Sequence, residues 1–115
     1  MPNNMVETKS FDFAVRIIKF SKWLKAEKRE FEIAKQILRS GTSIGANIAE
    51  AQYAQSRKDF VSKMHIALKE AYETEYWLRL IAAAEIASSK EIDSLREQLK
   101  QILKMLISIV KSAKQ

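Results

Sequence analysis

The sequence predicts an all-α protein, a single antiparallel bundle of four helices in up-down-up-down order. First, helix breakers are almost missing: the 115 residues include one proline, Pro2, and two glycines, Gly41 and Gly45. Second, apolar residues recur at spacings of three and four, without the strict alternation of a β-strand. Third, the length suits one domain with a sizeable core and short connections between its helices.

The periodicity divides the chain into four helical segments after a polar start. We expect residues 1–9 to be flexible and residues 10–115 to form the bundle, with helices over residues 10–26, 29–53, 56–87 and 89–113. The last helix carries an unbroken heptad seam, the pattern of helices that pack side by side. The six seam positions are Ile92, Leu95, Leu99, Ile102, Leu106 and Ile109.

Serine residues mark the starts of three of these helices. Ser10 is the expected N-cap of the first helix, because a serine oxygen can accept from N–H groups that have no partner within the helix. Ser56 and Ser88 are each followed three residues later by an acid, Asp59 and Glu91. This spacing is that of a capping box and predicts the starts of the third and fourth helices.

The segment 39–51 reads RSGTSIGANIAEA and continues the helical pattern despite its glycines. Gly41, Gly45 and Ala49 stack at a spacing of four, which allows another backbone to come unusually close. Two glycines inside a helix cost roughly 1 kcal/mol each, so tight packing must offset them. A phosphate-binding loop would need a wider glycine spacing followed by lysine. The pattern therefore predicts a buried packing helix.

The net charge is +6, from 20 basic and 14 acidic side chains, and it is unevenly distributed. Between Arg16 and Arg29 there are six basic residues and one acid, Glu27, whereas acids prevail over residues 70–97. Such a pattern suits a polyanion on one surface, and equally a head-to-tail association of unlike patches.

Residues for catalysis or metal binding are scarce. The chain has no cysteine and one histidine, His65, and no nucleophile lies in a pattern that would give it a base. We therefore expect no enzyme activity, no metal and no cofactor. The polar start predicts no signal peptide, and the apolar runs are too short to cross a membrane. A cytoplasmic location is expected.

Several residues are candidates for packing or for a subunit interface. Short polar side chains on the second helix, such as Ser43 and Asn47, suggest a contact with another helix or subunit rather than a solvated face. Glu75 lies among apolar residues, so we expect a cation from another helix or subunit, or a helix N-terminus, to pair with it. The full set is Gly41, Ser43, Gly45, Asn47, Glu50, Glu73, Glu75, Tyr76 and Trp77.

The basic surface of the first helix is the candidate nucleic-acid site. Arg16 and Lys19 share a side of the helix with Trp23, and a tryptophan among cations can stack on an unpaired base while the cations hold phosphates. An oligomer interface anchored by Trp23 is the alternative. The candidate nucleic-acid-binding residues are Arg16, Lys19, Lys22, Trp23, Arg39, Arg57 and Lys58.

Three blocks of the chain carry a family resemblance. The first is Ser43, Ile44, Asn47, Ile48 and Glu50; the second is Asp59, Phe60 and Lys63 followed by residues 66–68; the third is Glu73, Thr74, Tyr76, Trp77 and Leu78. Over about residues 10–86 they resemble the bacterial four-helix-bundle family first associated with intervening sequences in large-subunit ribosomal RNA genes. The fourth helix matches only in pattern, and Ala51 replaces a glycine common in that family.

The resemblance implies a cytoplasmic bundle that assembles into a ring, with a homopentamer as the family's arrangement. It also implies kinship with an accessory protein of diversity-generating retroelements, which binds nucleic acid and a reverse transcriptase. We therefore expect a non-enzymatic homo-oligomer that binds RNA or single-stranded DNA mainly through phosphate contacts. The alternative is an interaction scaffold or accessory subunit for a protein encoded nearby, with no nucleic-acid binding of its own.

Overall fold

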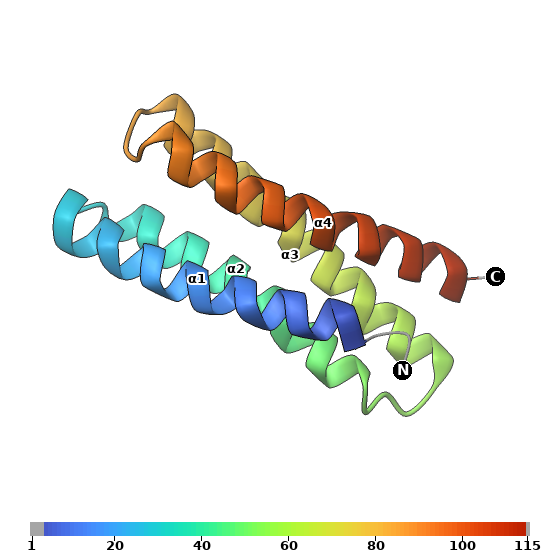
Figure 1. Ribbon diagram of the computed structural model, residues 1–115. Coiled ribbons are helices and arrows are strands. Elements are labelled where there is room, and N and C mark those ends of the chain that lie inside the picture. Colours follow the sequence, from blue (N-terminus) through green and yellow to red (C-terminus); the bar gives the residue numbers. More distant parts are fainter. Residues whose placement is uncertain (1–3, 115) are drawn as a thin grey trace.

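The computed structural model describes residues 4–114, which form four helices and no strand. The helices are α1 (Asn4–Lys28), α2 (Phe31–Ala51), α3 (Arg57–Ala83) and α4 (Ser89–Ala113). Successive helices run antiparallel in up-down-up-down order, so the molecule is elongated, with extents of 44 × 20 × 19 Å (Figure 1). The predicted all-α class with four helices is confirmed.

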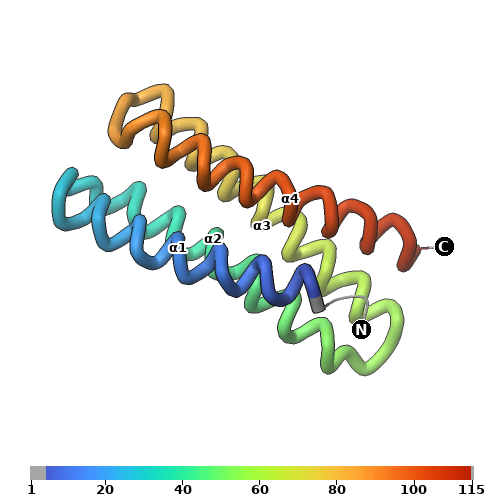
Figure 2. The backbone as a smooth tube through the Cα atoms, in the orientation of Figure 1, coloured from blue at the N-terminus to red at the C-terminus, as the bar shows by residue number. Residues whose placement is uncertain are grey.

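The four helices form two hairpins, α1 with α2 and α3 with α4 (Figure 2). Contacts are extensive between α1 and α2, between α2 and α3 and between α3 and α4, whereas α1 and α4 contact each other sparingly. The α1–α2 and α3–α4 turns lie at one end of the molecule, and the α2–α3 turn lies at the other end with the two chain termini (Figure 2). The bundle is therefore most open along the α1–α4 side.

Helix α1 begins six residues earlier than expected. Residues 4–9, assigned above to a flexible segment, are helical, while residues 1–3 of that segment lie outside the described residues. The physical reason is Val6, which is buried in the core one heptad before Phe13. Ser10 is consequently not an N-cap: it is buried inside the helix, where its hydroxyl donates to the Glu7 carbonyl oxygen at 3.0 Å.

The predicted caps of α3 and α4 are confirmed. The Ser56 hydroxyl accepts from the Asp59 N–H at 3.0 Å, and the Ser88 hydroxyl accepts from the Glu91 N–H at 3.3 Å. Asp59 reaches back to the N–H of Gln55, one residue before the cap, at 3.2 Å.

The connections after α1 and α3 each contain a non-glycine residue in the left-handed region. Arg29 has φ 56° and Glu85 has φ 57°. After Arg29 the chain closes the helix end, because the Glu30 N–H donates to the Leu24 carbonyl oxygen at 3.0 Å. Helix α1 ends at Lys28 rather than at residue 26. Helices α2 and α3 are shorter than expected: α2 spans residues 31–51 rather than 29–53, and α3 ends at Ala83 rather than near residue 87.

The core contains one face of each helix. In the heptad seam of α4 the first five positions are fully buried, while the sixth, Ile109, is partly buried against the core beside the buried Val110. The glycines of α2 face α1: a Cβ on Gly41 would lie 2.8 Å from Ile17 Cγ2, and one on Gly45 would lie 3.4 Å from the Ser10 carbonyl oxygen. The close approach predicted for this segment is confirmed.

The polar residue at the centre of the inward face of α3 is Thr74, not Glu75 as the sequence suggested. Thr74 and Ser40 are both fully buried, with their hydroxyl oxygens 2.9 Å apart, and Thr74 Oγ1 also lies 2.8 Å from the Glu70 carbonyl oxygen. Glu75 lies one residue further around the helix and is half-buried beside α4.

Thr74→Val should destabilise the fold by about 2 kcal/mol, because it keeps the side-chain shape but leaves the buried Ser40 hydroxyl without its partner. Urea unfolding followed by circular dichroism at constant protein concentration measures the change. The double variant Ser40→Ala/Thr74→Val removes both hydroxyls and should lie closer to wild type than Thr74→Val does. If Thr74→Val is as stable as wild type, the hydrogen bond between Thr74 and Ser40 contributes nothing to the free energy of unfolding.

Candidate nucleic-acid interface

A groove of about 800 Å³ opens between α1 and the start of α4, at the end of the molecule that holds the α1–α2 and α3–α4 turns. We call it the α1–α4 groove. Of the helix pairs that pack together among residues 4–114, α1 and α4 make the sparsest contacts. Its lining residues are Arg16, Lys19, Phe20, Trp23, Lys28, Glu85, Ile86, Ala87, Ser88 and Glu91.

The aromatic part of the α1–α4 groove is a stacked pair. Phe20 is buried in the core, and its ring lies 5.8 Å from that of Trp23 with an angle of 18° between the planes. Trp23 itself keeps 37% of its surface exposed, and Lys28 Nζ lies 5.5 Å from the centre of its ring. Trp23 is thus supported by the core from within and contacted by a cation.

The cations of the groove differ in their partners. Arg16 reaches across to α4, where it donates to Gln98 Oε1 at 2.9 Å and lies 3.7 Å from Glu91 Oε2. Lys19 makes no hydrogen bond or ion pair with any residue of 4–114, and neither does Lys22. Lys22 is exposed on α1 but does not line the groove.

The structure therefore brings Arg16, Lys19 and Trp23 together and adds Lys28, which the sequence analysis did not single out. The opposite wall, from Glu85 to Glu91, was also missed. No pattern in the sequence marks these residues, because the turn after α3 reaches α1 only through the tertiary packing. Only for Lys28 does the sequence give a signal, because Lys28 belongs to the run of basic residues over 16–29.

Three other predicted nucleic-acid-binding residues lie elsewhere. Arg39, on α2, is paired with Glu73 and with both carboxylate oxygens of Glu70 at 3.4 Å. Arg57 and Lys58 begin α3 at the opposite end of the molecule, where Arg57 Nε donates to the Ala113 carbonyl oxygen at 2.9 Å. These three cations do not extend the α1–α4 groove.

The short polar residues of α2 are satisfied within their own helix. The Ser43 hydroxyl donates to the Arg39 carbonyl oxygen at 2.7 Å, and the Asn47 amide donates to the Ser43 carbonyl oxygen at 2.8 Å. Hydrogen bonds from these two residues to another helix, which the sequence suggested, do not form among residues 4–114. Glu50 does reach another helix: it accepts from Lys63 Nζ at 2.9 Å, and this hydrogen bond raises the pKa of Lys63 above its usual value.

Glu73 is the centre of a polar cluster between α2 and α3. Its carboxylate pairs with Arg39 and accepts from Trp77 Nε1 at 3.0 Å. The Trp77 ring meets that of Tyr76 edge to face at 5.2 Å. Glu73 therefore joins α3 to α2 through Arg39, and Trp77 packs against the core, whereas Tyr76 remains half-exposed.

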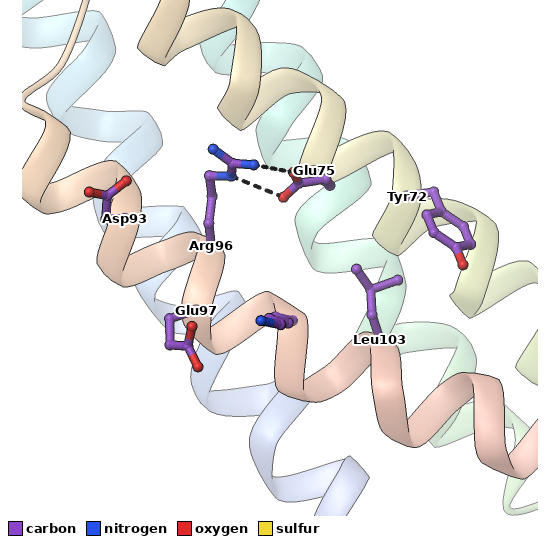
Figure 3. Close-up of a pocket in the computed structure, with 7 residues that line it drawn as sticks. Tyr72, Glu75, Asp93, Arg96, Glu97 and Leu103 are labelled. Atoms are coloured by element: carbon purple, nitrogen blue, oxygen red, sulfur yellow. Dashed lines mark hydrogen bonds and ion pairs between the residues drawn. The ribbon is translucent and has the colours of Figure 1, made fainter.

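Glu75 is paired with a cation from another helix, which is one of the alternatives that the sequence left open. Arg96 of α4 donates to both of its carboxylate oxygens, at 2.8 and 3.4 Å (Figure 3). The pair lies in a shallow pocket of about 450 Å³ between α3 and α4, with Tyr72 and Leu103 toward one end of it (Figure 3). Glu75 and Arg96 therefore neutralise each other within this pocket.

Residues 4–114 contain no group of three or more acidic or histidine side chains that could hold a metal ion. Among the same residues, no helix is both long and apolar enough to cross a membrane.

These features define the class, an all-α protein of four antiparallel helices with a groove of mixed charge at one end of the bundle. The chain belongs to the 23S rRNA-intervening sequence protein family, whose profile matches residues 3–108. The match includes most of α4, beyond the residues 10–86 over which the motifs carried the resemblance.

A solved structure supports the same assignment. The chain is similar to a protein of unknown function from the S23 ribosomal protein family of Bacteroides thetaiotaomicron, with 54% sequence identity and a TM-score of 0.94. The similarity covers 96% of this chain and 99% of the other. A comparison with the curated proteins finds no match.

Proposed function

We propose that this protein is a non-enzymatic, cytoplasmic homo-oligomer that binds RNA or single-stranded DNA mainly through phosphate contacts. The observation that carries the proposal is the row of α1 cations beside the α1–α4 groove. The ammonium groups of Lys19 and Lys22 form no hydrogen bond or ion pair with any residue of 4–114. Lys28 adds a third cation, beside Trp23. Unpaired surface cations in a row are suited to phosphates, because no internal ion pair has to be broken first.

Exposed apolar side chains support self-association. Phe11, Val15 and Ile18 are exposed at spacings of four and three on α1, and Tyr72, Tyr76 and Leu80 are exposed at spacings of four on α3. Scattered exposed apolar residues need no explanation, but two rows of them indicate interaction surfaces.

The positions of the two rows favour a ring. Helices α1 and α3 do not pack against each other among the described residues, so they occupy opposite corners of the bundle and their outer faces point apart. A contact between unlike faces is head-to-tail, and it closes into a ring when the rotation per subunit permits. We propose the homopentamer that the family resemblance implies.

The mass in solution tests the assembly. Sedimentation equilibrium should give five times the 13.2 kDa of the chain. Tyr76→Asp should lower that mass, because a charge in the α3 row must be desolvated at the interface. Tyr53→Asp is the matched control, since Tyr53 is more exposed but lies in the α2–α3 turn outside both rows. A monomeric wild-type chain would contradict the ring.

Binding is tested by fluorescence anisotropy of labelled single-stranded RNA and DNA over a series of salt concentrations. We expect log affinity to fall linearly with log salt, at roughly 0.7 per phosphate contact for a single strand. Several contacts should give a slope well above that of one phosphate. No binding at low salt would contradict the proposal and favour the alternative, an interaction scaffold or accessory subunit that docks a protein encoded nearby.

A further inference from the structure

We infer that the α1–α4 groove holds an unpaired nucleobase of a bound strand, stacked on Trp23. The phosphates of the same strand then lie outside, on the cations of α1. This inference rests on the proposed nucleic-acid binding and adds a specific subsite to it. The groove combines an aromatic side chain, an apolar wall and charges of both signs. A surface that binds only phosphates would need cations alone.

Trp23 offers a fixed platform for a flat ring. Phe20, buried in the core, lies nearly parallel to the indole at 5.8 Å and so limits its tilt. Ile86 and Ala87, on the opposite side of the groove, are partly buried against the core. A nucleobase between such walls removes apolar surface from water on both of its faces, and every base can stack in this way.

Lys28 is the group that a base would displace. Its ammonium lies 5.5 Å from the centre of the Trp23 ring, held there by the ring face alone among residues 4–114. Because Lys28 is an exposed, flexible side chain, it can leave the ring at small cost. Once displaced, it stands beside the bound nucleotide and can contact its phosphate.

The carboxylates of the groove favour the base over the phosphate as its occupant. Glu85 and Glu91 line the groove together with Arg16, Lys19 and Lys28. Carboxylates repel phosphate oxygens but accept hydrogen bonds from the amino groups of bases. Lys22 is exposed on α1 outside the residues that line the groove, so the backbone of a strand leaving the groove can meet a cation there.

Two oligonucleotides of equal length separate base stacking from phosphate binding: a natural single strand, and an abasic strand with the same number of phosphates. We expect the natural strand to bind about 10-fold more tightly, as one stacked base would provide. Trp23→Ala should abolish this ratio while leaving the salt dependence unchanged. Trp23→Phe should retain part of the ratio, and Trp77→Phe, the matched control on α3, should leave it unchanged.

The outcomes distinguish this inference from the proposed function. Equal binding of both strands, with a steep salt dependence, would overturn the base site and keep the phosphate-binding function. A base preference that survives in Trp23→Ala would place stacking elsewhere and overturn the inference. Binding of neither strand would overturn both. Thermal melting curves verify that each variant is folded.

Discussion

Replacing Gly41 with leucine is expected to destabilise the fold by about 3 kcal/mol. The position has no room for a side chain, because even a Cβ would lie 2.8 Å from Ile17 Cγ2 and 3.3 Å from Ile17 Cβ. Ile17 is fully buried and branched at Cβ, so it cannot turn aside in the way that the end of a flexible side chain could. The leucine must therefore force α1 away from α2.

Gly45→Ala is the matched control, one helical turn along the same face. A Cβ there would meet Ser10 at 3.4 Å or more, which is ordinary contact, and alanine improves the helix propensity by up to about 1 kcal/mol. We therefore expect this variant to be as stable as wild type or more stable. Urea unfolding at constant protein concentration measures both variants, since self-association would make stability depend on concentration.

A second-site change can verify the cause. Ile17→Ala removes the group that the new leucine would strike, so Gly41→Leu/Ile17→Ala should be more stable than the sum of the two single changes predicts. Additive losses, or a Gly41→Leu protein as stable as wild type, would show that the α1–α2 spacing does not depend on this glycine.

This contact also shows what could be predicted from the sequence. The glycine spacing and the heptad seam of α4 are local patterns, and each has one good packing solution within a bundle. The start of α1 was missed because nothing in the polar segment shows that Val6 reaches the core. The ends at Arg29 and Glu85 were missed because these positions usually hold glycine, and here they hold a cation and an acid.

The offset between Thr74 and Glu75 has a different cause. Both residues lie three or four positions from Ala71 and from Leu78, so helical spacing alone permits either at the centre of the buried face. The choice depends on α2, which presents the buried hydroxyl of Ser40 to α3. Only the tertiary arrangement supplies that partner, and the α1–α4 groove depends on tertiary packing in the same way.

Reversing two charges on α1 should have the largest effect on the proposed function. Lys19→Glu/Lys22→Glu removes two cations that have no partner within residues 4–114 and puts carboxylates in their place. We expect affinity for single-stranded RNA or DNA to fall at least about 10-fold at low salt, for all base sequences alike. The salt slope should fall by roughly 1.4, since each lost phosphate contact lowers it by roughly 0.7.

Lys100→Glu/Lys104→Glu is the control that separates local contacts from overall charge. Both lysines are exposed on α4 and lie outside the α1–α4 groove, and their reversal changes the net charge by the same amount. An equal loss of affinity in this variant would mean that binding depends on the total charge and is not localised on α1.

Arg16 is less suitable for reversal, because a carboxylate there would lose the Gln98 hydrogen bond and approach Glu91, so weaker binding could reflect a disturbed groove. If the α1 pair alone loses affinity and salt slope together, the phosphates lie along α1, beside the groove where Trp23 is exposed.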